Sequence, residues 1–169
     1  SISKMYAVSA IMRLVELGEL TLNTLASDVI PAFTGDGREE IRLRHLLTHT
    51  SGLIYESPEM AERLKTQTSL EDLIKEAYRA PLVFKPGTSL KYADYNTLIA
   101  GHVAEIVTGK SLPELVKTLV LGPMKLDDTF FPTPTSEDNR VAYVRGALAE
   151  GTPGAMYNSR YARALAHPP

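Results

Sequence analysis

The sequence predicts a mostly helical globular domain, and three observations support this. Apolar residues recur every three or four positions in several segments, which is the period of an amphipathic helix. Residues typical of helix caps stand at the ends of these segments. No set of consecutive segments alternates apolar and polar residues as half-buried β-strands do. With 169 residues, of which 44% are hydrophobic, the chain is long enough for one domain with a real core.

The first predicted helix runs from Ser1 to Leu17, and Gly18 is a fitting residue just beyond its end. Residues 20–33 are predicted to form a turn and a short helical piece that Pro31 ends, and residues 34–37 to form a loop. The apolar residues expected on the buried side of the first helix are Met5, Val8, Ile11, Met12 and Val15.

Three more short helices are predicted in the middle of the chain. Residues 41–48 form the first, which ends in a His-Thr-Ser-Gly turn. The Ser-Pro pair at 57–58 opens the second, with serine as N-cap and proline in the first turn. Thr68 and Glu71 form a capping box for the third, which ends before Pro81.

A Pro-Gly-rich approach then delivers Tyr92 to the start of a longer helix. Asp94 is predicted to cap this helix, and Gly109 to end it. The residues expected on its apolar side are Leu98, Ile99, Val103 and Ile106. Ser111-x-x-Glu114 is a capping box for a last helix that runs to about residue 121, and from residue 133 the chain is rich in Gly, Pro, Ser and Ala.

Ser1 and Lys4 are the first candidates for chemistry. On a helix, residues three apart share a face with Cβ atoms about 5–6 Å apart, so the amine of Lys4 can reach Ser1 Oγ. A serine hydroxyl needs a base to take its proton, and a desolvated lysine with a lowered pKa can be that base. The alternative interpretation is an ordinary solvated first turn, because the same spacing occurs on many surface helices.

Other reactive groups are less well supported. A Ser-His-Asp triad through His49, or Ser51 as a second nucleophile, lacks the Gly-x-Ser-x-Gly turn of such enzymes. His45 lies four residues before His49, a spacing that zinc sites use, but no third ligand is evident. Residues 35–37, Gly-Asp-Gly, lack the Lys-Ser/Thr of a phosphate-binding loop.

Four segments in a fixed order give a more specific signal. They are Ser1 with Lys4, Leu-Leu-Thr-His-Thr-Ser-Gly-Leu at 46–53, Tyr-Ala-Asp at 92–94, and Gly-Pro-Met-Lys-Leu-Asp-Asp-Thr at 122–129. In this order they resemble the serine β-lactamase and penicillin-binding-protein superfamily. The branch is that of class C β-lactamases, D-Ala-D-Ala carboxypeptidases and β-lactamase-like esterases, and the resemblance covers residues 1–132.

The resemblance implies an α+β, β-lactamase/transpeptidase-like fold. Residues 1–169 would be a single incomplete domain that covers mainly the helical lobe and little of the antiparallel sheet. Upstream strands and a later Lys-Thr-Gly or His-x-Gly strand, which the family has, are not found here. We therefore expect these residues to be the middle of a longer protein, for example as a cleavage product or as one chain of a split molecule. Alternatively, Ser1 is a mature N-terminus whose α-amine serves as base, as in N-terminal nucleophile hydrolases.

The resemblance also implies roles for individual residues. Ser1 would be the nucleophile, Lys4 its base if burial keeps part of it neutral, and Tyr92 the phenol that passes a proton toward the leaving group. Asp94 is a candidate substrate-binding residue, at a position where the family often has asparagine. A carboxylate beside Lys4 raises the lysine pKa, so an esterase-leaning site, a purely capping Asp94 and a weakened enzyme all stay open.

The expected function is that of a serine hydrolase that acts through an acyl-enzyme on carboxylic esters, β-lactams or D-amino-acid peptides. It needs no metal and no cofactor. The alternative is a catalytically silent homologue that serves as a binding or structural module. The partners expected are a small-molecule substrate and, in a split molecule, a second chain that completes the domain. The sequence does not choose between cell envelope, secretion and cytoplasm.

Composition further narrows the possible partners and kinds of site. A net charge of −2 with dispersed basic residues gives no reason to expect nucleic acid as a partner. The chain has no cysteine, which excludes disulfides and thiolate metal sites. No apolar run approaches the 18 residues of a membrane span.

Overall fold

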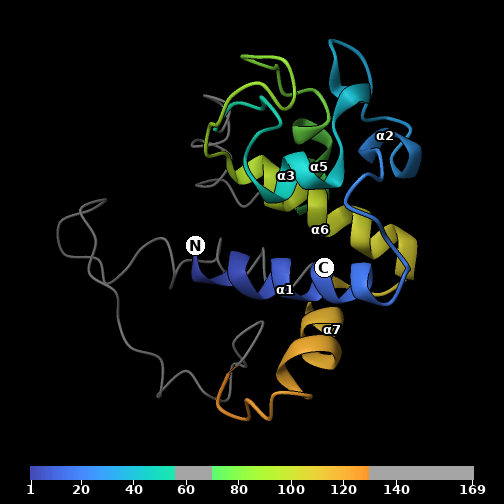
Figure 1. Ribbon diagram of the computed structural model, residues 1–169, viewed down its shortest axis with the longest axis vertical. Coiled ribbons are helices and arrows are strands. Elements are labelled where there is room, and N and C mark those ends of the chain that lie inside the picture. The colour runs from blue at the N-terminus through green and yellow to red at the C-terminus, as the bar shows by residue number, and fades with distance from the viewer. Residues whose placement is uncertain (56–69, 130–169) are drawn as a thin grey trace, which may run out of the picture.

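The computed structural model describes residues 1–55 and 70–129 of the chain (Figure 1). The helices within these ranges are α1 (Ile2–Glu16), α2 (Ala26–Val29), α3 (Leu43–Leu47), α5 (Leu70–Ala77), α6 (Asp94–Thr108) and α7 (Leu112–Val116). A 3₁₀ turn covers Arg38–Glu40, and a π-helical turn, Lys117–Leu121, extends α7. The same ranges contain no regular strand, only isolated antiparallel bridges between Leu25 and Arg42 and between Leu53 and Leu82. The described part is therefore helical, as predicted.

Helix α6 is the centre of the packing. It contacts α1, α2, α3 and α5, while α7 packs on α1 (Figure 1). In the view of Figure 1, α2, α3 and α5 gather around α6 on one side of α1, and α7 lies on the other side. Because α6 has neighbours on several sides, seven of its 15 residues are buried, including Tyr95, Ile99 and Val103.

The predicted apolar faces were only partly right. In α1 the buried residues are Ala7, Ala10, Ile11 and Leu14, whereas the side chains of Met5 and Met12 are 70% and 42% exposed. The two alanines allow α1 to approach its neighbours closely, so the contact face is set by small residues that hydrophobicity alone does not single out. On α6, Ile106 is 46% exposed although it was predicted to lie on the apolar side.

Most of the predicted helix ends are confirmed. Gly18 and Gly109 have φ angles of 79° and 66°, the left-handed conformation that suits glycine after a helix. Ser111 and Glu114 form the predicted capping box. The predicted cap at Asp94 is wrong, because Ala93 is the N-cap residue and Asp94 is the first residue of α6. The predictions for residues 57–58, for Thr68 and for the segment from residue 133 concern residues outside the described ranges.

Candidate active site

Four residues singled out from the sequence lie in one cluster at the N-terminal ends of α1 and α6. The Tyr92 hydroxyl is 2.8 Å from Ser1 Oγ. Lys4 Nζ donates a hydrogen bond to Ser1 Oγ at 3.4 Å and lies 5.3 Å from the centre of the Tyr92 ring. Lys4 Nζ also forms an ion pair with Asp94 Oδ1 at 2.7 Å. The hydroxyl, the amine, the phenol and the carboxylate are thus within reach of one another, although 91 residues separate Ser1 from Tyr92.

Local backbone geometry explains why these four side chains lie close together. Ser1 is the N-cap residue of α1, and the Lys4 N–H donates to the Ser1 carbonyl oxygen at 3.1 Å, so the first turn brings the two side chains together. Ala93 has extended backbone angles, φ −148° and ψ 132°, and its side chain is buried. In an extended backbone the side chains of the two flanking residues point away from the side chain between them. Because the Ala93 side chain points into the core, Tyr92 and Asp94 both face α1.

The electrostatics of Lys4 differ from the expectation. Burial lowers the pKa of Lys4 and is the largest single influence. The hydrogen bonds and charges of Asp94 and Tyr92 together outweigh it, so the pKa is raised above its ordinary value. Lys4 is therefore an ammonium at neutral pH, and the condition that burial alone keeps part of it neutral is not met. In this state it places a positive charge 3.4 Å from Ser1 Oγ, which favours the deprotonated form of that hydroxyl.

A second set of polar residues lies behind this cluster. His49 Nδ1 accepts a hydrogen bond from the Ala93 N–H at 3.3 Å and lies 3.0 Å from Asn96 Nδ2. Ser51 Oγ donates to Asn96 Oδ1 at 2.5 Å and accepts from the Leu53 N–H at 3.1 Å. Ser51 and Asn96 are fully buried. Because its hydroxyl is committed to Asn96, the geometry gives Ser51 no role as a nucleophile.

Sequence reasoning missed Asn96. The signal was an amide side chain in the first turns of an otherwise apolar helix, directly after Tyr95 and three residues before Ile99. A polar side chain at such a core-facing position needs buried partners, which His49 and Ser51 provide.

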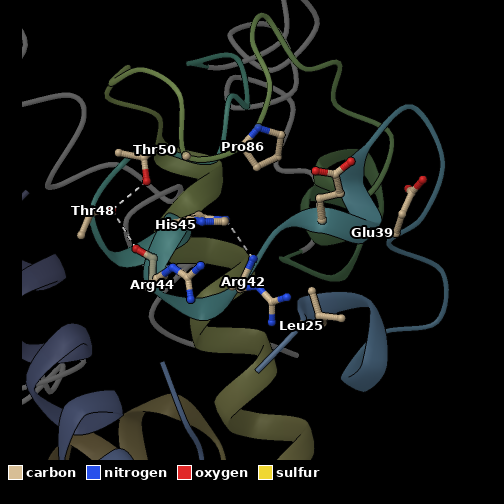
Figure 2. Close-up of a pocket in the computed structure, with 10 residues that line it drawn as sticks. Leu25, Glu39, Arg42, Arg44, His45, Thr48, Thr50 and Pro86 are labelled. Carbon is tan, nitrogen blue, oxygen red and sulfur yellow. Dashed lines mark hydrogen bonds between the residues drawn. The ribbon is translucent and has the colours of Figure 1, made fainter. Parts of the chain in front are cut away.

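The structure also contains a pocket of about 630 Å³ (Figure 2). None of Ser1, Lys4, Tyr92 and Asp94 lines it. Its lining residues are Leu25, Glu39, Glu40, Arg42, Arg44, His45, Thr48, Thr50, Pro86 and Gly87.

The charged groups of this pocket hold neighbouring loops. Arg42 donates to the main-chain carbonyl of Asn23 at 2.8 Å, and Arg44 donates to the side chain of the same residue. Glu40 forms an ion pair with Lys85 at 3.3 Å. The ring of His45 accepts a hydrogen bond through Nδ1 from the Arg42 N–H. In the described ranges, no group of three or more His, Cys, Asp or Glu residues is placed to hold a metal ion.

Comparison with known proteins gives the family. A family model described as beta-lactamase matches residues 1–166. The chain belongs to the serine β-lactamase and penicillin-binding-protein superfamily. A Salmonella schwarzengrund protein named "Putative D-alanyl-D-alanine carboxypeptidase" is similar to this β-lactamase-family chain, with 33% identity over 143 residues. The match covers 76% of this chain and 32% of that protein.

Solved structures of the superfamily share the fold. A family VIII carboxylesterase superimposes with a TM-score of 0.74 and 30% identity, over 86% of this chain and 40% of that one. A D-stereospecific amidohydrolase from a Streptomyces species gives a TM-score of 0.67 and 28% identity, over 78% and 43% of the two chains. This chain thus corresponds to part of a β-lactamase-like fold, and its described part is mostly helical.

No helix among the described residues has both the length and the apolar character needed to cross a bilayer.

Proposed function

We propose that this chain carries the nucleophile of a serine hydrolase that forms an acyl-enzyme on Ser1. The observation that carries the proposal is the contact of Ser1 Oγ with both the Tyr92 hydroxyl, at 2.8 Å, and Lys4 Nζ, at 3.4 Å. A hydroxyl that touches a phenol and an amine has two neighbours able to move its proton. Membership of the β-lactamase family supports the same reaction class.

The reaction would proceed in two steps. Ser1 Oγ attacks the substrate carbonyl carbon, and its proton passes to Lys4 Nζ in the neutral fraction of that lysine. The Tyr92 phenol then relays a proton to the leaving group, which departs as an alcohol or amine. Water attacks the ester on Ser1 in the second step, which releases the acid and returns the proton to the serine. Because Asp94 holds Lys4 as an ammonium, the rate should rise toward alkaline pH.

Carboxylic esters are the substrate class that we favour. A carboxylate at residue 94 accepts hydrogen bonds only, so Asp94 cannot donate to a substrate carbonyl as an asparagine amide does. Esters place less demand on such a donor than peptides do, because their leaving group is expelled more readily. The carboxylesterase neighbour, whose match covers 86% of this chain, is consistent with this choice. D-amino-acid peptides and β-lactams remain the competing substrates.

A fluorophosphonate probe with peptide mapping tests the proposal in the complete protein that contains this chain. We expect labelling at Ser1 that Ser1→Ala abolishes and Lys4→Ala reduces. Ser3→Ala is the matched control, because this exposed serine lies on the same turn of α1. Tyr92→Phe should slow labelling by about 10²-fold or more, the usual size of an acid–base contribution.

The competing function is a catalytically silent homologue, which the ion pair of Lys4 with Asp94 favours. Absence of labelling at Ser1 in the folded, complete protein supports the silent homologue and overturns the proposed hydrolase function. If Ser1 is labelled, turnover of a short-chain nitrophenyl ester against a chromogenic cephalosporin separates esterase from β-lactamase.

A further inference from the structure

His49 touches the segment that carries Tyr92 at three points. Its carbonyl oxygen accepts a hydrogen bond from the Lys91 N–H at 2.9 Å, and its ring Nδ1 accepts from the Ala93 N–H at 3.3 Å. Its ring packs on the Tyr92 ring, with centroids 4.6 Å apart and planes 33° from parallel. Lys91 and Ala93 flank Tyr92, so His49 holds the backbone on both sides of the tyrosine and also the ring itself.

The buried amide of Asn96 fixes the orientation of the His49 ring. Asn96 Oδ1 accepts from Ser51 at 2.5 Å, which leaves its NH₂ group to face His49 Nδ1 at 3.0 Å. The backbone N–H of Ala93 can only donate, so Nδ1 carries no proton and the ring proton is on Nε2. His49 is therefore a neutral imidazole that accepts at Nδ1.

The surrounding charges agree with a neutral ring. Burial, and then the Lys4 ammonium, lower the pKa of His49 against the opposing effect of Asp94. Among the described residues, Lys4, Asp94 and Tyr92 are the titratable groups that act on this ring or contact it. A proton on Nδ1 would also face the donor groups of Ala93 and Asn96, so the cation would lose both hydrogen bonds.

We propose that His49, as the neutral imidazole, is a positioning residue that holds the Tyr92 hydroxyl against Ser1 Oγ. This inference rests on the function proposed above, in which Tyr92 moves a proton. The phenol reaches Ser1 at 2.8 Å from a side chain that is itself 40% exposed, so the core does not enclose it. The contacts from His49 to Tyr92 and its two neighbours supply the restraint that burial does not.

The test compares three variants in the complete protein, by the rate at which the fluorophosphonate acylates Ser1 per folded molecule. His49→Ala removes the ring and Nδ1, and should slow acylation about 30- to 100-fold, the order of loss expected when a reacting group is misplaced by about 1 Å. His49→Asn keeps a side-chain oxygen that can accept from Ala93 but has no ring to pack on Tyr92, so it should restore part of the rate. His102→Ala, which removes a half-buried histidine of α6 remote from Ser1, should stay within about twofold of wild type.

Two further measurements separate positioning from general stability. Phe33→Leu shrinks a fully buried core side chain outside the site and should lower the melting temperature without the rate loss of His49→Ala. A crystal structure of the wild type should show the 2.8 Å contact between the Tyr92 hydroxyl and Ser1 Oγ. A crystal structure of His49→Ala should show the hydroxyl displaced from this contact. If His49→Ala does not fold, His49→Asn and His49→Gln serve for both measurements.

The outcomes decide between the two proposals. Acylation of the His49 variants at the His102→Ala rate, with the 2.8 Å contact retained, overturns the positioning role. A wild-type protein that is not labelled at Ser1 overturns the proposed function instead, and the crystallographic distance then decides by itself whether His49 positions the phenol.

Discussion

Replacement of Asp94 by asparagine acts most directly on the proposed chemistry. The ion pair between Lys4 Nζ and Asp94 Oδ1 is 2.7 Å long, with side chains that are 23% and 41% exposed. Water screens a pair this accessible, so its coupling is roughly 0.2–1 kcal/mol. Since 1.36 kcal/mol corresponds to a factor of ten, removal of the carboxylate should raise the neutral fraction of Lys4 about 1.4- to 5-fold.

The expected result is a faster enzyme near neutral pH. Asp94 contributes to the raised pKa of Lys4, so Asp94→Asn lowers that pKa and moves the rising limb of the pH–rate profile toward lower pH. The assay is the initial rate of nitrophenyl ester hydrolysis between pH 6 and 10, with the rate of Ser1 acylation measured in parallel. Asp127→Asn, at an exposed aspartate beyond α7, is the matched control. A rate that is unchanged or lower in Asp94→Asn, with Asp127→Asn at the wild-type value, would refute Lys4 as the base.

Two stability predictions follow from the same region. The pKa of His49 is lowered by burial and by the Lys4 charge, so below about pH 6.5 the unfolded chain binds more protons than the folded one. Unfolding free energy should therefore fall on acidification, by less than about 1.4 kcal/mol per pH unit for this ring because solvent screens it. Urea titrations between pH 5 and 7.5 measure this dependence of the unfolding free energy on pH. The same dependence in His49→Asn as in the wild type would contradict the prediction. Gly52→Ala should destabilise severely, because a Cβ there would lie 2.2 Å from the Phe84 carbonyl oxygen at a φ of 87°. Gly109→Ala, with a φ of 66° and no atom within 4 Å of the added carbon, should cost only about 1–2 kcal/mol, and equal losses of melting temperature in the two variants would count against steric exclusion at Gly52.

The helices could be predicted because their signals are local. The capping box at Ser111 and the glycines after α1 and α6 act within a few residues, so the sequence alone locates these ends. The face that a helix buries is not a local property. In α1, alanines pack against the neighbouring helices while Met5 lies exposed, because close approach of the backbones decides the contact.

The candidate site likewise combines contacts that are local in the sequence with contacts that are not. The spacing of Ser1 and Lys4 predicts their contact, since a helical turn brings them together. The position of Tyr92 followed only from the family resemblance, because its contact with Ser1 spans 91 residues. The ion pair of Lys4 with Asp94 could be anticipated from charge, but the balance of its pKa depends on burial and distance, which the sequence does not contain.

The backbone at His49 gives independent support for a role beyond packing. Its φ of 57° is left-handed, which costs a residue with a Cβ about 1–2 kcal/mol. It also follows α3, a five-residue helix that is too short to be stable by itself and depends on tertiary contacts. A glycine would adopt this conformation with no steric cost, as Gly52 does in the same turn. At His49 this costly backbone conformation carries a ring that lies on Tyr92, with centroids 4.6 Å apart, as the positioning role requires.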